Sequence, residues 1–588
     1  MMDFRSLIGQ GKPLLFDGAM GTLFAARPGC ADIPCEQAAL LMPGVVEEIH
    51  RQYLEAGAQA IKTNTFGMSA QPDEAVVRAA CRIAQKAAEP YGAFVFADIG
   101  PAAQGGALGM AQTYIRQADW FLSEGVRCFL METLSTDEGV AEFAAYLKHK
   151  EPDSFLIVSY AVGADGVTAD GVLGAELFRR TGALAQVDAV GFNCVSGPSH
   201  LLNYVQKLNH EGVCLSVMPN AGYPTVLGRR AVFMGTPEYF GAQLGQIAQA
   251  GACIVGGCCG TTPEHIAQAR KALDALPDRN AQTAVQTPKT VRTPGRNALG
   301  ELLDSGKRVI AVELDPPADD DISFFMDGVR TLRDMGADAI TIADCPVGRP
   351  RADSSLLACK IRRELGVEPL PHMTCRDRNM NATKALLLGL SMEGVHNVLL
   401  VTGDPIPTAE RDEVKSVFNF NSRKLAQYVR GLNEEVLTTP FRLFGALNIN
   451  AVNFDRQLEL AQEKERCGIT GFLTQPVLSK EALDNLIRAR GVLKAKMLGG
   501  IFPVVSHRNA LFLNNEISGM HVADEIVALY ENKTREEAEE LAVRISAEVA
   551  RAIAPHVDGY YLMTPFKRVS LMARILQEIR DISPDPRC

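Results

Sequence analysis

Three cysteines in the first half of the chain stand beside glycine or asparagine, directly after short apolar runs. Cys194 ends the motif GFNC, and Cys258 and Cys259 lie in the motif GGCCG that spans residues 256–260. Thiolates that converge from two strand ends make a soft, electron-rich site, and the metal that suits it best is zinc. Three protein ligands would leave the fourth tetrahedral position open, where zinc would hold and ionise a substrate thiol.

Two other interpretations of these cysteines stay open on this pattern. A free cysteine is often only a small buried apolar side chain, and the chain contains 14 cysteines. Cys258 and Cys259 would alternatively form a vicinal disulfide. Neighbouring residues of a strand face opposite sides, so both thiols reach one metal only where the backbone turns. Gly256, Gly257 and Gly260 permit such a turn, and this context favours zinc.

The elements that must position these residues alternate between short apolar runs and longer amphipathic stretches. In the first half the sequence predicts strands at residues 13–17, 58–63, 94–98, 128–132, 155–161, 188–193, 213–219 and 253–257. In the second half it predicts strands at residues 309–314, 339–343, 370–374, 397–402, 442–448, 469–475, 497–502 and 559–564. This repetition predicts an α/β fold of two (β/α)8 TIM barrels, with an open, doubly wound sheet as the alternative.

A polar segment with three prolines divides the chain. Residues 276–297 read LPDRNAQTAVQTPKTVRTPGRN and show neither helical nor strand periodicity, which is typical of a linker. We therefore expect a first domain at residues 1–275, a Pro-rich linker at residues 276–297 and a second domain at residues 298–588. Each half has the size of one large barrel.

The composition of the 588 residues, 47% apolar and 22% charged, is that of an ordinary globular enzyme. The net charge of −10, without any Lys/Arg-rich run, argues against a nucleic-acid partner. No apolar stretch reaches the length of a membrane span, and the first residues lack the apolar core of a signal peptide. Irregularly spaced thiols without an export signal predict a cytoplasmic localisation and no membrane partner.

Five motifs of the first half resemble the homocysteine S-methyltransferase family. They are FDGAMGT at residues 16–22, TNTF at 63–66, ET at 132–133, GFNC at 191–194 and GCCG at 257–260. The resemblance implies that Cys194, Cys258 and Cys259 bind zinc and that the sulfur of homocysteine takes the open position. The physical chemistry agrees, because zinc lowers the pKa of a bound thiol and the thiolate attacks an activated methyl group.

The same resemblance implies roles for residues around the thiols. Asp17 and Glu132 would receive the ammonium group of the amino acid, and the backbone amides of Gly18, Ala19 and Met20 would receive its carboxylate. A lone Asp-Gly pair is alternatively an ordinary turn. The expected position of Asp17 at the C-terminal end of a barrel strand favours the functional interpretation.

The methyl donor stays open. The chain carries no Asp-x-His-x-x-Gly signature of the corrinoid module found in cobalamin-type methionine synthases. The candidate donors are a sulfonium or betaine-like compound, methyltetrahydrofolate itself, and a methylated corrinoid on a separate protein.

Four motifs of the second half resemble the methylenetetrahydrofolate reductase family, which uses FAD on a (β/α)8 barrel. They are VELDPP at residues 312–317, PHMTC at 371–375, TGDP at 402–405 and LTQP at 473–476. The resemblance implies two catalytic residues: Glu313 as the general acid that helps open methylenetetrahydrofolate, and Asp404 near the flavin, where it binds the folate pterin. It also implies a folate contact through Gln475. The residues that would help hold FAD are His372, Thr402, Gly403, Asp404 and Lys464.

Simpler roles compete with two of these assignments. Glu313 would alternatively be a surface residue beside a double proline, and Asp404 an ordinary turn aspartate.

Taken together, the residues and both resemblances predict a bifunctional enzyme of one-carbon metabolism. One barrel would methylate homocysteine to methionine at zinc. The other would reduce 5,10-methylenetetrahydrofolate to 5-methyltetrahydrofolate with FAD and NAD(P)H. In one alternative, only the reductase is active and the first barrel senses homocysteine or zinc; in another, the first barrel only captures homocysteine. The sequence leaves open the choice between NADH and NADPH, the formation of a homo-oligomer, and direct transfer of the methyl group between the barrels.

Overall fold

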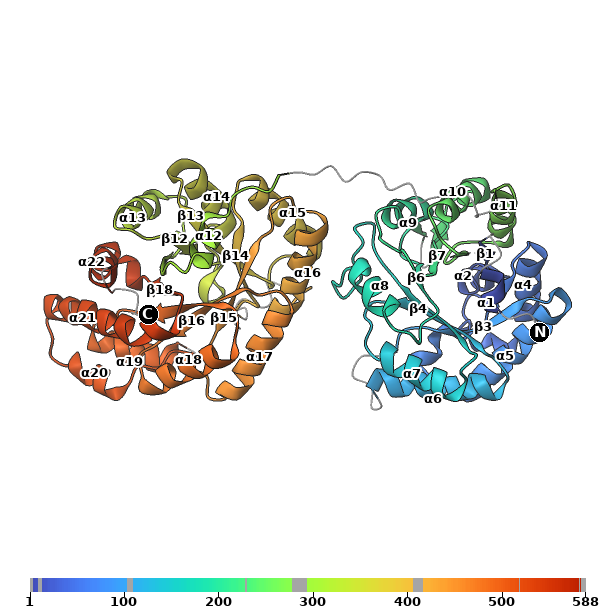
Figure 1. The fold of residues 1–588 in the computed structure, drawn as a ribbon, viewed down its shortest axis with the longest axis horizontal. Coiled ribbons are helices and arrows are strands. Elements are labelled where there is room, and N and C mark those ends of the chain that lie inside the picture. Colours follow the sequence, from blue (N-terminus) through green and yellow to red (C-terminus); the bar gives the residue numbers. More distant parts are fainter. Residues whose placement is uncertain are drawn as a thin grey trace. The chain divides into compact units, whose positions relative to one another are not determined.

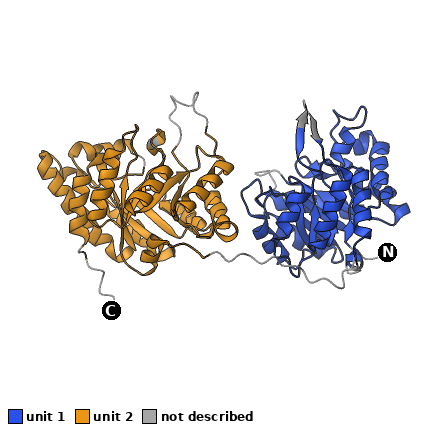
Figure 2. Cartoon of the chain, turned by 90° about the horizontal axis from the view of Figure 1, so that it is seen from above, with its two compact units in different colours: residues 1–290 blue, residues 291–588 orange. Residues whose placement is uncertain are grey.

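The computed structural model describes residues 4–8, 13–102, 109–227, 230–277, 293–404, 416–517, 519–580 and 582. The chain divides into two compact units, unit 1 at residues 1–290 and unit 2 at residues 291–588, which Figure 1 and Figure 2 show. Most of the linker predicted at residues 276–297 lies outside the described residues, which resume at residue 293.

Unit 1 is built on an eight-stranded parallel sheet that curls into a nearly closed barrel (Figure 1). Its strands, in spatial order, are β1 (Leu14–Leu15), β10 (Ile254–Val255), β7 (Leu215–Met218), β6 (Ala189–Asn193), β5 (Phe155–Tyr160), β4 (Cys128–Leu134), β3 (Phe94–Ile99) and β2 (Ala60–Lys62). A parallel bridge between Phe16 and Ala60 joins the two ends of this order. The strands are almost fully buried, as expected when helices cover one face and side chains fill the barrel.

Helices connect the strands of unit 1 and cover the outside of the barrel (Figure 1). They are α2 (Gly21–Ala25), α3 (Ala38–Leu41), α4 (Pro43–Glu55), η1 (Phe66–Ser69), α5 (Glu74–Ala88), η2 (Glu89–Tyr91), α6 (Gly109–Ser123), α7 (Val140–Lys150), α8 (Gly174–Gly182), α9 (Pro198–Val205), α10 (Pro237–Gln249) and α11 (Pro263–Asp274). Helix α5 shows why such segments are helical. Asp73 caps its first amides, and its apolar residues recur on one buried face.

A short helix, α1 (Phe4–Ile8), packs against the interior of the first barrel. The ring of Phe4 is 2% exposed, and its centroid lies 4.6 Å from that of Phe155 and 4.9 Å from that of Phe96. Arg5 anchors the helix through an ion pair of 2.8 Å with Asp188, which directly precedes β6. Helix α1 therefore seals the N-terminal end of the barrel, opposite the strand ends that carry the predicted site.

Unit 2 is a fully closed barrel of eight parallel strands. In order they are β11 (Val309–Leu314), β12 (Ala339–Ile342), β13 (Glu368–Thr374), β14 (Asn397–Val401), β15 (Arg442–Leu447), β16 (Gly471–Pro476), β17 (Lys496–Ile501) and β18 (Gly559–Met563), with β18 paired to β11. A shift of register between β16 and β17 falls at Leu473–Pro476, around the predicted folate contact Gln475.

The helices of unit 2 also alternate with the strands, and two additional helices, α19 and α20, lie between β17 and α21. The helices are α13 (Ser323–Asp334), η4 (Pro346–Gly348), α14 (Ser354–Leu365), α15 (Met380–Met392), α16 (Ser422–Glu435), α17 (Phe454–Arg466), α18 (Lys480–Val492), α19 (His507–Glu516), α20 (Asp524–Leu529), α21 (Arg535–Ile553), η6 (Ala554–His556), η7 (Pro565–Lys567) and α22 (Val569–Arg580). The preceding helix, α12 (Ala298–Asp304), inserts the buried side chains of Leu299 and Leu303 among residues of the barrel interior. Unit 2 thus has its own helical plug.

The prediction of two α/β barrels is confirmed, and the alternative of an open, doubly wound sheet is wrong. Each predicted strand coincides with an observed one, with ends that differ by a few residues. The sequence analysis missed the antiparallel hairpin of β8 (Pro224–Leu227) and β9 (Arg230–Phe233), whose strands lie between β7 and α10. Among the described residues, no helix combines the length and the apolar character that crossing a membrane requires.

The plug of the first barrel leads to a stability prediction. Phe4→Ala should lower the free energy of unfolding of unit 1 by about 3–5 kcal/mol, because it removes a buried ring and leaves a cavity. The only tryptophan of the chain, Trp120, lies on α6, so its fluorescence in a urea titration reports on unit 1. Leu7→Ala, at a partly buried position of the same helix, is the control and should cost less. Equal losses for the two variants would contradict the plug.

Candidate active sites

The three predicted zinc ligands lie together at the C-terminal mouth of the first barrel. The Sγ atoms of Cys194, Cys258 and Cys259 all lie within 4.8 Å of one another, and the Cys194–Cys259 separation is 3.7 Å. All three cysteines are free, so the predicted alternative of a vicinal disulfide is not formed. Cys258 is buried and the other two are partly exposed, which leaves the cluster accessible from one side.

The backbone around Cys194 is strained in a way that serves this geometry. Cys194 and Val195 have φ angles of 57° and 55°, in a region that non-glycine residues, and β-branched ones above all, rarely adopt. The Cys194 amide donates to the carbonyl of Met218 on β7 at 3.1 Å. Such strain persists only where its surroundings impose it, and it gathers at functional sites.

Gly257 brings Cys258 to the same point from the end of β10. A Cβ atom on Gly257 would lie 2.4 Å from Oγ1 of Thr261, so only glycine fits there. Thr261 in turn donates to the carbonyl of Cys258 at 2.7 Å. The turn that the sequence analysis expected between the two adjacent cysteines is therefore held by a specific side chain.

The donor set fits zinc. A zinc–sulfur bond of about 2.3 Å places sulfurs about 3.8 Å apart on a tetrahedron, close to the 3.7 Å between Cys194 and Cys259. Hydrogen bonding to Cys194 and burial raise the pKa of Cys258 well above the usual range of a thiol, so this sulfur holds its proton until a cation replaces it. Metal binding at this site should therefore release protons.

Beside the thiols lies a buried acidic cluster that contains an unexpected lysine. Asp17 and Glu132 are 3% and 6% exposed, and Lys62 on β2 is 7% exposed. The Nζ atom of Lys62 lies 3.8 Å from Oδ1 of Asp17 and 3.7 Å from Oε2 of Glu132. It also donates to the carbonyl of Gly257 at 3.5 Å. The two carboxylates predicted to receive a substrate ammonium thus already flank an ammonium of the chain itself.

A third buried carboxyl group, that of Asp98 on β3, belongs to the same cluster. Burial, with repulsion from Glu132, raises the pKa of Asp98 well above its usual range. Burial also raises the pKa of Asp17 to about 7, although Lys62 opposes this shift. Oδ1 of Asp17 and Oδ1 of Asp98 are buried without a hydrogen-bond partner among the described residues. The cluster therefore has acceptor atoms to spare.

Asn193 connects the acidic cluster to the thiols. Its Nδ2 donates to Oε2 of Glu132 at 3.2 Å and lies 3.9 Å from Sγ of Cys258. Its Oδ1 accepts from the amide of Thr133 at 2.9 Å, and Thr133 has a φ angle of 61°. Asn193 thus holds the end of β4 and aims Glu132 toward the thiols.

The backbone predicted to bind a substrate carboxylate follows β1. The amide of Ala19 donates to Oγ1 of Thr261 at 3.0 Å, and the carbonyl of Ala19 accepts from Tyr53 at 2.8 Å. These bonds fix the turn at Gly18 and occupy one of the predicted donors. The carboxylate-binding role of Gly18, Ala19 and Met20 stays a prediction, and it would require the Ala19 amide to exchange its partner.

In unit 2, Glu313 on β11 lies at the C-terminal mouth of the barrel. The hydroxyl of Tyr561 on β18 donates to Oε2 of Glu313, and Nε2 of His372 on β13 lies 3.7 Å from the same oxygen. Burial lowers the pKa of His372 to about 4, so its ring is neutral at pH 7. Nε2 of His372 is buried and has no hydrogen-bond partner within the described parts of the chain.

The environment of Glu313 suits a general acid. Burial, with repulsion from Asp315, raises the pKa of Glu313 to about 7, while the hydrogen bond from Tyr561 opposes the rise. A carboxyl group with this pKa holds its proton in part of the molecules at neutral pH and can donate it. The alternative of an ordinary surface glutamate does not fit this burial.

The segment from Thr402 to Asp404 follows β14 and lies against the end of β13. Gly403 has a φ angle of 94°, and a Cβ atom there would lie 3.0 Å from Cβ of Thr374. Arg376, only 2% exposed, donates to the carbonyl of Asp404 at 2.9 Å. The position of the predicted catalytic Asp404 is therefore set by a buried arginine that the sequence analysis did not single out.

The other predicted contacts for FAD and folate come from one helix and one further strand. Lys464 on α17 donates from Nζ to the carbonyl of Ala446 on β15 at 2.8 Å, and burial lowers its pKa to about 8. Gln475 lies on β16, where its carbonyl closely faces Gly500 of β17. Gln475 lies near the C-terminal end of its strand, whereas Lys464 lies in the last turn of its helix and reaches β15 with its side chain. The roles of both residues in binding stay predictions.

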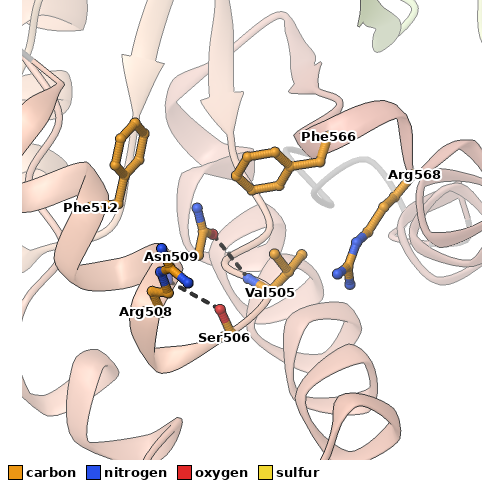
Figure 3. A pocket seen from close by; sticks show the side chains of 7 residues that line it. All are labelled: Val505, Ser506, Arg508, Asn509, Phe512, Phe566 and Arg568. Carbon is orange, nitrogen blue, oxygen red and sulfur yellow. Dashed lines mark hydrogen bonds between the residues drawn. The ribbon is translucent and has the colours of Figure 1, made fainter.

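A pocket of about 320 Å³ lies beyond the ends of β17 and β18 (Figure 3). Its lining combines two aromatic rings, two guanidinium groups, two small polar side chains and one valine: Val505, Ser506, Arg508, Asn509, Phe512, Phe566 and Arg568. Phe566 is 66% exposed and has a φ angle of 48°. This lining was not predicted; the segments that form it hardly stand out in the sequence.

The sequence analysis also missed the partners of several predicted residues. Lys62 and Tyr561 approach Glu132 and Glu313 from strands distant in the sequence, so no local pattern pairs them. Arg376 offered a signal, because it follows the predicted strand end in the charged run Arg376-Asp377-Arg378.

Family comparisons agree with both sites. Residues 14–273 match the model of the homocysteine S-methyltransferase family, and residues 298–580 match that of the methylenetetrahydrofolate reductase family. The chain carries one domain of each family. Both families are enzymatic, and the match of each covers nearly the whole of one barrel.

Individual relatives cover part of the chain. A methionine synthase from Mycobacterium tuberculosis is 31% identical over 308 residues, which are 46% of this chain and 25% of that protein. One from Mycobacterium leprae is 30% identical over 303 residues, 45% of this chain and 24% of that protein. The matched segment thus spans about a quarter of these curated relatives.

Solved structures of the homocysteine methyltransferase MmuM from Escherichia coli are similar over the same share of the chain. The metallated form is 24% identical with a TM-score of 0.38, and it covers 46% of this chain and 99% of that chain. The apo form is 25% identical with a TM-score of 0.37.

The thiol cluster yields a test by metal analysis. Cys259→Ser should lower zinc affinity by at least about tenfold, since loss of even an outer hydrogen-bond partner of a ligand costs that much. Cys253→Ser is the matched control, because Cys253 lies directly before β10, at its opposite end, and should leave zinc content unchanged. Elemental analysis of dialysed protein measures both. A full complement of zinc in Cys259→Ser would remove this cysteine from the ligand set.

Proposed function

We propose that unit 1 methylates homocysteine to methionine at a zinc ion held by Cys194, Cys258 and Cys259. The observation that carries this proposal is the spacing of the three sulfurs, which suits tetrahedral zinc and leaves one position open. Zinc, when bound, would lower the pKa of the acceptor thiol and so supply the nucleophile. The family match of unit 1 supports homocysteine as the acceptor.

The residues of the chain would orient the acceptor. The ammonium group of homocysteine would be received by Asp17 and Glu132, and its carboxylate by the backbone from Gly18 to Met20. The thiol would then enter the open side of the cluster, where Cys194 and Cys259 are partly exposed. Binding through both charged ends would select an α-amino acid over a simple thiol.

The methyl donor is constrained by its leaving group. The leaving group needs no proton when the donor is a sulfonium, a betaine-like compound or a methylated corrinoid on a separate protein. Methyltetrahydrofolate leaves as an amine that must be protonated, and a zinc thiolate supplies no such proton. A direct folate donor would therefore require an acid near the thiols, for which Asp17 and Asp98, with raised pKa values, are the available groups.

We also propose that unit 2 reduces 5,10-methylenetetrahydrofolate to 5-methyltetrahydrofolate with FAD and NAD(P)H. FAD, when bound, would carry the hydride from the nicotinamide to the folate. Glu313 would protonate the folate as its ring opens, and Asp404 and Gln475 would bind it. His372, Thr402, Gly403 and Lys464 would help hold the cofactor. The burial that raises the pKa of Glu313 to about 7 supports the assignment.

The pocket in Figure 3 is a further place for the substrates of unit 2. Phe512 and Phe566 offer apolar faces, and Arg508 and Arg568 offer positive charge. A flat ring system that carries carboxylate or phosphate groups would suit this lining. Folates and nicotinamide nucleotides both have this character. We expect such chemistry in the cytoplasm, where these small molecules are available.

The first activity is tested by a panel of methyl donors. Purified, zinc-loaded protein free of corrinoid is incubated with homocysteine and either a sulfonium, a betaine, methyltetrahydrofolate or a methylated corrinoid protein. Methionine, measured by mass spectrometry, should form with at least one donor and should disappear after zinc removal. Formation of no methionine with any donor would favour the sensing role of the first barrel.

The second activity is tested by the pH dependence of flavin reoxidation. Reoxidation by methylenetetrahydrofolate needs protonated Glu313, so its rate should fall as the pH rises through about 7. Tyr561→Phe removes the hydrogen bond that favours the ionised form, and should move this fall to higher pH. Glu313→Gln should slow reoxidation by about 10²- to 10⁴-fold. Stopped-flow absorbance measures each rate.

Reduction of the flavin by NAD(P)H is the internal control, because that half-reaction needs no acid from Glu313. It should stay nearly unchanged in both variants. Normal reoxidation in Glu313→Gln, or a shift to lower pH in Tyr561→Phe, would assign the acid to another group.

A further inference from the structure

Lys62 has no role in the function proposed so far, although it lies at the centre of the acceptor site. A lysine is rarely buried unless it is paired, and Lys62 is 7% exposed at the end of β2. Burial alone would lower the pKa of Lys62, but Glu132 and Asp17 outweigh it and raise this pKa well above the usual range. Lys62 is therefore a permanent cation inside the barrel.

The ammonium of Lys62 lies near two carboxylates but is not within hydrogen-bond distance of either. Its Nζ lies 3.8 Å from Asp17 and 3.7 Å from Glu132, which is ion-pair distance but longer than a hydrogen bond. Within the described residues, the Lys62 ammonium makes one hydrogen bond, to the carbonyl of Gly257. The Lys62 ammonium thus attracts both carboxylates without a direct hydrogen bond to either, and Oδ1 of Asp17 keeps no hydrogen-bond partner among the described residues.

The charge of the cluster also leaves room for a second cation. Asp17, Asp98 and Glu132 offer three carboxyl groups to the single ammonium of Lys62. The raised pKa values of Asp17 and Asp98 mean that one cation does not offset the burial of these groups. Oδ1 of Asp17 and Oδ1 of Asp98 have no hydrogen-bond partner among the residues that the structure describes, so each would accept from a further N–H donor.

We propose that Lys62 is a positioning residue that sets the specificity of the acceptor site: its charge keeps the carboxyl groups of Asp17 and Glu132 in place, and the ammonium of the acceptor joins them as the second cation. This inference rests on the proposed function of unit 1. The site would then recognise an α-amino thiol through a shared two-cation, three-carboxyl cluster. A thiol without the amino group would leave the unpartnered oxygens buried and unsatisfied.

Removal of Lys62 should act through its partners. Without this ammonium, Asp17 and Asp98 lose the charge that opposes the effect of burial, so their protonated forms become more favourable. A protonated carboxyl group attracts an ammonium far less than an ionised one does. The loss should therefore fall on acceptors that carry an ammonium group, and spare those that do not.

The experiment is isothermal titration calorimetry on the full-length, zinc-loaded protein with two thiols. One is L-homocysteine and the other is 4-mercaptobutanoate, which differs only in lacking the amino group. Lys62→Met removes the charge and keeps the apolar stem, and Lys62→Arg keeps the charge as the matched control. Zinc content and circular dichroism of each variant establish that the barrel is folded.

The wild-type protein should bind homocysteine more tightly than 4-mercaptobutanoate. Lys62→Met should weaken homocysteine binding by about tenfold and change 4-mercaptobutanoate binding by less than about twofold, while Lys62→Arg keeps most of the preference. If Lys62→Met does not fold, Lys62→Gln replaces it with the same expectation.

Three results would overturn the inference. Tighter homocysteine binding by Lys62→Met would mean that Lys62 competes with the substrate ammonium. Equal loss for both thiols would mean that Lys62 serves only the stability of the barrel, and unchanged binding of both would mean that it has no part in the site. Failure of the wild-type protein to bind either thiol would instead overturn the proposed function, and this inference with it.

Discussion

Closure of the first barrel is the constraint on which its site depends, because Asp17 lies where the two edges of the sheet, β1 and β2, meet. Its amide donates to the carbonyl of Ala60 on one side, and its carbonyl accepts from the amide of Gly257 on the other, both at 3.0 Å. Its carboxylate accepts from the amide of Lys62 at 3.0 Å. The residue expected to bind the substrate is thus also the residue that joins the edges of the sheet, so the acidic cluster exists only when the barrel is closed.

In both barrels, the energetically unfavourable conformations and buried polar groups gather at the C-terminal ends of the strands. In unit 1 these are the left-handed conformations of Thr133, Cys194 and Val195 and a group of buried carboxyls. In unit 2 they are a partly buried Glu313 with a raised pKa and a neutral His372 whose Nε2 has no hydrogen-bond partner in the described part of the chain. Apolar burial along the strands and helices offsets such local costs, and a bound ligand would relieve several of them. Stability and function are therefore divided between the two ends of each barrel.

The sequence predicts features that depend on neighbouring residues, and it does not predict contacts between residues that are far apart in the chain. Strands, helices and the motifs at strand ends were predictable, because apolar runs and glycine-bounded thiols are patterns of neighbouring residues. The burial of the Lys62 side chain was not predictable, because a lysine in a three-residue strand is expected to be exposed. The bond between Tyr561 and Glu313 joins residues 248 positions apart and becomes visible only when β18 pairs with β11. The single bridge that closes the first barrel was equally beyond reach, because it depends on the curvature of the whole sheet.

Each barrel begins with its own plug, α1 in unit 1 and α12 in unit 2. A barrel whose base is sealed by a segment just ahead of its first strand needs nothing from another domain to cover its apolar interior. Genes for such barrels can be joined end to end without exposing either core, provided that the plug travels with its strands. The order of elements in this chain is that of two modules, each of which can be inherited as a unit. We expect the boundary of a natural fusion or separation to lie ahead of α12 and not within the barrel that follows.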